Sequence, residues 1–388
     1  VLGQETHLTT IAVRAMARAY RHNNHICHRG PILTCLKQIF TRQMLVPAIL
    51  LFMTAQVPVY ASPITPLPTF GPGVVELTIT DERTDRPLAG HLWYPATTPG
   101  KSGQVGQSRA WKMAKADPDG TLAEGKFPLL VVSHGMYGNR LNQSWLASEL
   151  SQRGFMVAMV DHPGTSTFLR EADQARQLWE RPVDLSRLIS FLVEQSPFKH
   201  SIDTDRIYAA GHSLGGYTVL LTAGAEFDND RYQAGCFGET RIPVVCDVFA
   251  QWSVAKTKTD QMAMTQSRKD PRIRKVVSLD LGGTPVLSRQ SLAAIDIPVL
   301  VLGSGRADML DQSLESRALA AAMPPKLVRH LELDDAGHFD FMGVCKPEGY
   351  AILKKNLPGD EIVCVKGGDE REAQHRRIIA EILSFLEE

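Results

Sequence analysis

The pentapeptide Gly-His-Ser-Leu-Gly at residues 211–215 limits the possible folds of this chain more than any other segment. Apolar residues 207–210 predict a strand before it, and residues 213–224 predict a helix after it. A serine flanked in this way is typical of a sharp strand-to-helix turn that exposes its hydroxyl to a base and a substrate carbonyl. We therefore predict that Ser213 is a nucleophile, in preference to an ordinary glycine-rich turn.

Length and composition permit a scaffold around this turn. The chain has 388 residues, of which 44% are hydrophobic and 22% charged, enough for one large core. Its 42 basic and 42 acidic residues balance, so the composition does not indicate a nucleic-acid-binding protein.

Alternating strand and helix signals predict an α/β architecture with a mostly parallel central sheet flanked by helices. Residues 74–80 and 88–94 predict an antiparallel pair. Short apolar runs predict buried parallel strands at 129–132, 156–160, 207–210, 275–279, 299–302 and 328–333. Apolar residues at intervals of three and four predict helices at 142–153, 183–194, 213–224, 310–322 and 370–387.

One long interval, residues 226–271, breaks this alternation. It is polar with scattered large apolar residues, and we interpret it as a cap inserted into a catalytic domain that spans residues 62–388. A disordered loop is the alternative. Trp252, Tyr137 and Tyr217 could line a pocket, although packing elsewhere suits each of them equally well.

A serine nucleophile needs backbone donors for the oxyanion that forms during acyl transfer. The loop 133–138 follows a predicted strand, and in this architecture such a loop supplies the second amide. We predict that the N–H groups of Met136 and Leu214 are the donors. His134 and His212 flank the site, and we expect them to orient loops rather than to act as the base.

The base is predicted to be His338, which lies on a loop after the last strand. Two strand ends offer an acid, Asp280 and Asp308. We prefer Asp308, because the 338 − 308 = 30 residues before the histidine leave room for one helix and one strand. Asp280 remains the alternative acid.

The N-terminal region, residues 1–61, carries six basic residues and one acidic residue. It contains an apolar run at 44–53 that is too short for a membrane span but suits a signal peptide. Small residues at positions 59 and 61 predict cleavage after Ala61, and hence a secreted or periplasmic protein with no stable membrane insertion. Residues 1–36 fit an over-extended start or, alternatively, an organelle-targeting peptide.

Four cysteines beyond residue 61 form two local pairs, Cys236 with Cys246 and Cys345 with Cys364. An oxidising compartment would close both as disulfides, in agreement with export. Four buried thiols are the alternative.

Four segments together resemble dienelactone-hydrolase-like α/β hydrolases, to which platelet-activating-factor acetylhydrolases are similar: 133–136, 160–164, 211–216 and 337–339. The resemblance covers roughly residues 74–388. It implies the α/β-hydrolase fold, with Ser213 as nucleophile, His338 as base, and the oxyanion donors named above. Dienelactone hydrolases proper have cysteine at the position of Ser213, and the acetylhydrolases take their acid from the strand end that matches Asp280. Exported lipases and polyester-degrading esterases share the same turn and the later acid position.

These observations predict an exported serine hydrolase that cleaves small or short-acyl carboxylic esters through a Ser-His-Asp triad and an acyl-enzyme. The predicted partner is a small-molecule ester, and the mechanism needs no metal or organic cofactor. Lipase or phospholipid acetylhydrolase activity is an alternative. Serine peptidase activity and a non-catalytic binding role are alternatives of other classes.

Overall fold

The computed structural model describes residues 70–388, apart from 82–83, 98–101, 119, 240–242 and 366–367. The predictions for the N-terminal extension and the signal peptide therefore lie outside the described residues. Among the described residues, no helix combines the length and the apolar character that crossing a bilayer requires.

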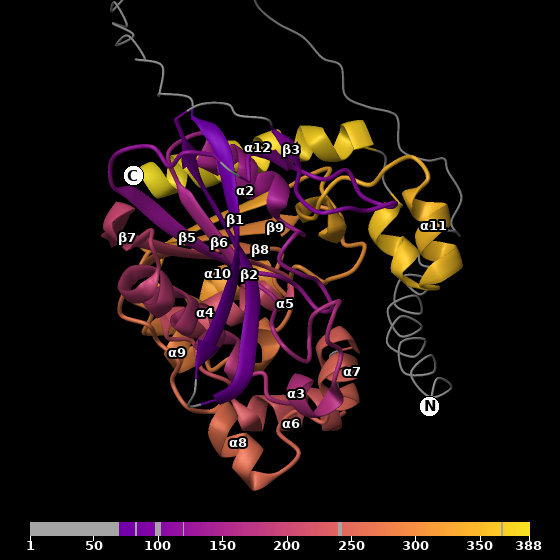
Figure 1. Cartoon of the computed structure of the whole chain (residues 1–388). Helices are drawn as coiled ribbons and strands as arrows, with labels where there is room; N and C mark the ends of the chain where they lie inside the picture. The colour runs from indigo at the N-terminus through magenta and orange to yellow at the C-terminus, as the bar shows by residue number, and fades with distance from the viewer. Residues whose placement is uncertain (1–69, 82–83, 98–101, 119, 240–242, 366–367) are drawn as a thin grey trace, which may run out of the picture.

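The described residues form an eight-stranded sheet in the order β1-β2-β6-β5-β7-β8-β9-β10 (Figure 1). β1 pairs antiparallel with β2 and β2 with β6, whereas all pairs from β6 to β10 are parallel. The strands are β1 (Gly71–Asp81), β2 (Thr84–Ala96), β5 (Phe127–Ser133), β6 (Met156–Val160), β7 (Ile202–His212), β8 (Ile273–Leu279), β9 (Val299–Ser304) and β10 (Val328–Leu333). Each predicted strand is present, and the predicted α/β-hydrolase architecture is confirmed. A separate pair, β3 (Gly103–Gln104) and β4 (Lys115–Ala116), lies outside this sheet.

The central strands are apolar throughout because both of their faces are covered. Successive side chains of β5 alternate between two buried clusters: Leu129 and Val131 belong to one, Leu130 and Val132 to the other. The first cluster packs under α4 (Glu180–Ser190) and α5 (Leu214–Ala223), and the second under α2 (Ser144–Ser151) and α12 (Gly368–Glu387). The sheet is thus the middle layer of three, as Figure 1 shows.

The interval 226–271 contains three helices, α6 (Asn229–Phe237), α7 (Pro243–Gln251) and α8 (Lys258–Met264). Phe227, Tyr232, Phe249 and Trp252 are buried in the first cluster. The described part of this interval is therefore folded onto the domain, and the alternative of a disordered loop does not apply to it.

The remaining elements join these layers. They are α3 (Ala172–Ala175), α9 (Arg289–Ala293), α10 (Ser316–Ala322), α11 (Gly349–Asn356), and the short helical turns η1 (Phe191–Gln195), η2 (Lys199–Ser201), η3 (Thr284–Val286), η4 (His338–Phe341) and η5 (Asp360–Cys364). The structure contains both predicted disulfides, Cys236–Cys246 and Cys345–Cys364. The second disulfide ties the start of the segment that carries α11 to the end of η5.

Replacing Cys345 and Cys364 together by serine is expected to lower the free energy of unfolding by about 3 kcal/mol, because the disulfide restricts a loop of intermediate length in the unfolded chain. Urea unfolding of the oxidised proteins measures the difference. Addition of a reductant should lower the free energy of unfolding of the wild type toward that of the variant. Equal stability of the two oxidised proteins would contradict the expectation.

Candidate active site

Ser213 lies in a strained turn between β7 and α5, with φ 55° and ψ −120°. A non-glycine residue adopts such a conformation only where the surrounding structure imposes it. A Cβ on Gly215 would lie 2.0 Å from the carbonyl oxygen of Ser133, and one on Gly211 would lie 2.1 Å from the carbonyl oxygen of Gly215. The two glycines therefore allow α5 to start directly against the neighbouring strands, and this contact holds Ser213 in its turn.

His338 reaches Ser213 from the loop after β10. Its Nε2 lies 3.0 Å from Ser213 Oγ, and its Nδ1 lies 2.6 Å from Asp280 Oδ2. The carbonyl oxygen of His338 accepts a hydrogen bond from His212 Nε2 at 2.8 Å. Serine, histidine and aspartate thus form one continuous hydrogen-bonded chain.

The geometry contradicts the preferred prediction that Asp308 contacts the imidazole. Asp308 Oδ1 accepts the backbone N–H of His338 at 3.1 Å, and its Oδ2 contacts Arg306. The Asp308 side chain is 28% exposed, whereas that of Asp280 is fully buried. Asp280 follows β8, which adjoins β7 in the sheet, whereas Asp308 follows β9, one strand farther from Ser213. Chain spacing alone could not reveal this difference, because both intervals have room for the intervening elements.

Asp280 is held as an ionised carboxylate. Burial by itself raises its pKa, but the hydrogen bond and charge of His338 and the backbone N–H of Ser304 outweigh that effect and lower the pKa below its usual value. Its Oδ1 accepts hydrogen bonds from Ser304 N and Gln312 Nε2, both at 2.8 Å. A carboxylate fixed in this way favours the imidazole tautomer that carries its proton on Nδ1 and leaves Nε2 free to accept one. Gln312 was not predicted as a site residue, because no recognisable motif surrounds it in the sequence.

Gly135 brings the predicted oxyanion loop against the serine. A Cβ on Gly135 would lie 3.2 Å from Ser213 Cβ, so glycine permits this close approach. In the part of the chain that the structure describes, the N–H groups of Met136 and Leu214 have no hydrogen-bond acceptor. Both groups belong to segments that meet beside Ser213.

The two other histidines near Ser213, His134 and His212, both contact backbone carbonyls. Burial is the main cause that lowers the pKa of His212 to about 3 and the pKa of His134 well below its usual value, so both are neutral. His212 donates to the carbonyl of His338, and His134 Nδ1 lies 2.7 Å from the carbonyl of Gly135.

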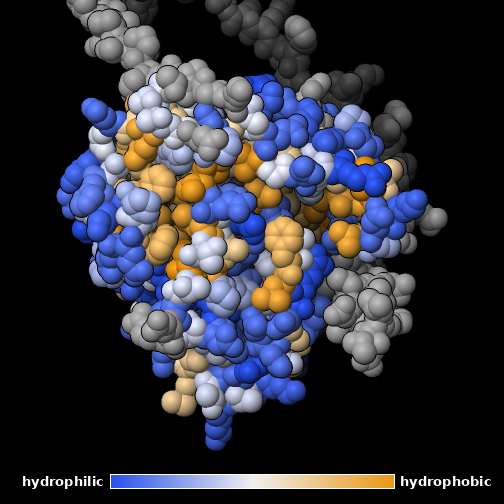
Figure 2. Space-filling view, in the orientation of Figure 1, coloured by the Kyte–Doolittle hydropathy of each residue, from blue (hydrophilic) through white to orange (hydrophobic). Residues whose placement is uncertain are grey.

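A pocket of about 220 Å³ opens above Ser213 and His338. Its walls are mostly apolar and come in part from α7, α11 and η5. The apolar lining residues include Met136, Leu214, Val245, Val248, Phe249, Leu310, Leu353, Leu357 and Val363. Figure 2 shows hydrophobic side chains gathered across the middle of one face of the molecule, among hydrophilic ones.

The three aromatic residues considered for the pocket have different positions. Tyr137 lines it, and its hydroxyl accepts a hydrogen bond from Trp252 Nε1 at 2.9 Å. Trp252 is buried behind Tyr137, and Tyr217 packs in the core. Among the described residues, His, Cys, Asp and Glu side chains form no group of three arranged to hold a metal ion.

Comparison with known proteins identifies the class to which this fold and site belong. Residues 129–348 match the profile of the alpha/beta hydrolase family, and the chain belongs to that family. This match confirms the resemblance on which the sequence analysis relied.

Similar curated proteins include hydrolases and a cutinase. Platelet-activating factor acetylhydrolase of Cavia porcellus is 26% identical over 151 residues, which cover 28% of this chain and 34% of that protein. Bis(hydroxyethyl) terephthalate hydrolase of Streptomyces coelicolor is 28% identical over 103 residues, covering 26% of this chain and 30% of that protein. Cutinase est2 of Thermobifida alba is 22% identical over 214 residues, which cover 54% of this chain and 52% of that protein. The chain thus spans only about a third of the length of the first two relatives.

A solved structure supports the fold. The ferulic acid esterase from Streptomyces cinnamoneus superposes with a TM-score of 0.54 at 20% identity, covering 82% of this chain and 90% of that chain. At this level of identity the likeness concerns the fold alone. The prediction of a carboxylic ester hydrolase agrees with the names of these relatives.

Glu315 provides a pH-dependent test of the packing behind Asp280. Its carboxylate accepts the N–H groups of Gly283 and Thr284 at 2.9 and 2.8 Å, and burial raises its pKa from 4.5 to about 7. The Glu315 carboxyl therefore binds its proton more tightly in the folded state than in the unfolded state. Its contribution to the free energy of unfolding decreases as the pH rises from about 4.5 to about 7.

A Glu315→Gln variant lacks this titration, so its free energy of unfolding relative to that of the wild type should increase between pH 4.5 and pH 8. Urea unfolding of both proteins at several pH values checks the prediction. A difference in stability that does not change with pH would contradict it.

Proposed function

We propose that this protein is an exported serine hydrolase that cleaves carboxylic esters with small or short acyl groups. The observation that carries the proposal is the hydrogen-bonded chain from Ser213 through His338 to Asp280 beneath an apolar pocket. The names of the relatives support ester hydrolysis as the activity.

The proposed mechanism starts with proton transfer from Ser213 Oγ to His338 Nε2, as the oxygen attacks the ester carbonyl carbon. Asp280 stabilises the imidazolium that forms and holds its orientation. The N–H groups of Met136 and Leu214 donate to the oxyanion. The imidazolium then protonates the leaving alcohol, and the acyl group remains on Ser213 until water, activated by the same histidine, releases the acid.

The pocket supports the restriction to small acyl groups. Its volume of about 220 Å³ lies below the roughly 300–1,000 Å³ typical of sites for drug-sized ligands. α7, from the interval 226–271, and the disulfide-linked segment 345–364 form part of its walls, so we assign a cap role to both. The two disulfides support an oxidising compartment and therefore export.

Ser213→Ala is expected to lower the hydrolysis of a p-nitrophenyl ester by at least a thousandfold, and by about a millionfold if it behaves like comparable triads. The wild type should prefer acetate and butyrate esters over palmitate, and a serine-directed organophosphonate should label Ser213. Retention of the normal melting temperature in the variant controls for misfolding. Absence of an adduct on Ser213 in the wild type would favour a non-catalytic role, and residual activity above a thousandth would reject Ser213 as nucleophile.

Asp280→Asn and Asp308→Asn form a matched pair that separates the two candidate acids. We expect Asp280→Asn to reduce kcat about ten-thousandfold, because the amide no longer fixes the imidazole tautomer. Asp308→Asn keeps an oxygen that can accept the N–H of His338, so its kcat should change less than about tenfold. Steady-state kinetics of both variants decides between them, and a larger loss for Asp308→Asn would overturn the assignment of Asp280.

A further inference from the structure

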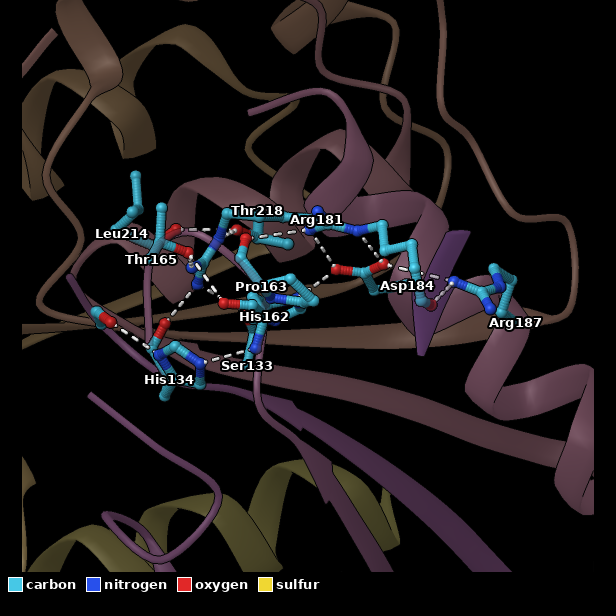
Figure 3. A network of polar contacts seen from close by, with 12 residues as sticks. Ser133, His134, His162, Pro163, Thr165, Arg181, Asp184, Arg187, Leu214 and Thr218 are labelled. Carbon is cyan, nitrogen blue, oxygen red and sulfur yellow. Dashed lines mark hydrogen bonds and ion pairs between the residues drawn. The ribbon is translucent and has the colours of Figure 1, made fainter. Parts of the chain in front are cut away.

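A second serine, histidine and aspartate meet beneath the oxyanion loop (Figure 3). Ser133 Oγ lies 2.9 Å from His162 Nε2, and His162 Nδ1 lies 2.9 Å from Asp184 Oδ2. These contacts join the same atom types as those around Ser213. All three residues are completely buried, however, so no substrate can reach Ser133. We therefore expect these three residues to have a structural role rather than a catalytic one.

The hydrogen-bond donors and acceptors of this network can be assigned along its whole length. Arg181 Nη2 donates to Ser133 Oγ at 3.1 Å. Because Nδ1 of the neutral His162 ring carries the proton toward Asp184, its Nε2 accepts, and the Ser133 hydroxyl donates to it. His162 Nδ1–H then donates to Asp184, which also accepts two hydrogen bonds from Arg86 at 2.8 Å each. Burial and the nearby charge of Arg181 lower the pKa of His162 well below its usual value, which agrees with a neutral ring.

Arg181, on α4, connects three segments that do not adjoin in the sequence. Its guanidinium donates to the carbonyl oxygen of His134, to Thr165 Oγ1 at 2.6 Å and to Thr218 Oγ1 at 2.9 Å. Its pKa, lowered by burial to about 9, leaves it charged at neutral pH. A buried cation with several fixed acceptors resists displacement, because breaking any of these contacts leaves a desolvated charge unsatisfied.

Two of the residues that Arg181 contacts, Thr165 and Thr218, form further hydrogen bonds next to the proposed oxyanion donors. The carbonyl of Thr165 accepts the N–H of Tyr137 at 2.8 Å, immediately after Met136. Thr218 Oγ1 donates to the carbonyl of Leu214 at 2.9 Å in the first turn of α5. Arg181 thus holds the loop after β5 and the start of α5 in one relative position.

His134 acts directly on the peptide that contains the Met136 N–H. Its Nε2 accepts the backbone N–H of His162 at 3.0 Å, so its proton is on Nδ1 and is donated to the carbonyl of Gly135. The Gly135 carbonyl and the Met136 N–H belong to one planar trans peptide and point in opposite directions. Fixing the carbonyl therefore also fixes the direction of the N–H.

We propose that Arg181 and His134 are positioning residues that orient the Met136 and Leu214 amides toward the transition-state oxyanion. The proposal rests on the ester-hydrolase function proposed above. Neither residue touches the substrate; both act through the backbone.

The experiment compares His134→Leu with His134→Asn. Asparagine places its amide nitrogen near the position of Nδ1 and can still donate to the Gly135 carbonyl, whereas leucine cannot. We expect His134→Leu to lower kcat about 10- to 100-fold, less than the 100- to 1,000-fold that loss of an oxyanion donor causes, with KM nearly unchanged. His134→Asn should recover most of this loss. Inhibition by a trifluoromethyl ketone, whose tetrahedral adduct carries the oxyanion, should weaken in parallel with kcat.

Arg181→Met and Thr218→Val test the same network from α4 and from α5. Thr218→Val removes the acceptor of Arg181 Nε and the donor to the Leu214 carbonyl, while Arg181 keeps its contacts with Ser133, His134 and Thr165. Arg272→Met is the matched control, because Arg272 also bonds to α4, at the carbonyl of Ser186 and at Ser190 Oγ, but outside the network. We expect Thr218→Val to lower kcat about threefold to tenfold, and Arg272→Met to reduce stability without changing kcat.

Unchanged kcat in His134→Leu and Thr218→Val, or equal losses in His134→Leu and His134→Asn, would overturn the positioning role even if Arg181→Met does not fold. A parallel rise in KM would also overturn it, since that pattern indicates general distortion of the pocket. An inactive wild type that no organophosphonate labels would reject the proposed function itself, whereas an active wild type with fully active variants would reject only this inference.

Discussion

The close contact between the turn at Ser213 and the end of β5 determines the rest of the site. Gly215 lies so near the carbonyl of Ser133 that any side chain there would collide with it. Because β5 and β7 are neighbouring parallel strands, their carboxyl ends meet at one edge of the sheet, and the loop after β5 has to pass beside Ser213. The strained backbone of Ser213 and the glycine at 135 are both consequences of this packing.

The polar groups around the site divide into two kinds according to their access to substrate. Ser213 and His338 face the apolar pocket, whereas Ser133 and His162 form similar hydrogen bonds where no solvent reaches them. A serine hydrogen-bonded to a histidine–aspartate pair can therefore react with a substrate only where a pocket opens beside it. Figure 3 shows this buried set, in which Arg181 of α4 is hydrogen-bonded to His134 of the oxyanion loop.

Much of the architecture was predictable because its signals are local. Continuous apolar runs indicated strands buried on both faces, and helical periodicity indicated the helices between them. The two disulfides were predictable because each pair is close in the sequence. The structure places Asp280, and not the preferred Asp308, against the imidazole of His338. The sequence could not reveal this contact, because both aspartates follow strands and only the order of strands in the sheet separates them.

The sequence by itself determined the position of the serine turn, the strands that lead to it and the histidine loop, since each depends on residues within a few positions of one another. Only the tertiary structure decided which carboxylate meets His338, and which side chains brace the oxyanion loop. Arg181 lies 47 residues from His134 and 37 from Thr218, and nothing in the sequence indicates that they touch. The physical reason is that adjacency across a parallel sheet follows strand order, which is set by packing of the whole domain.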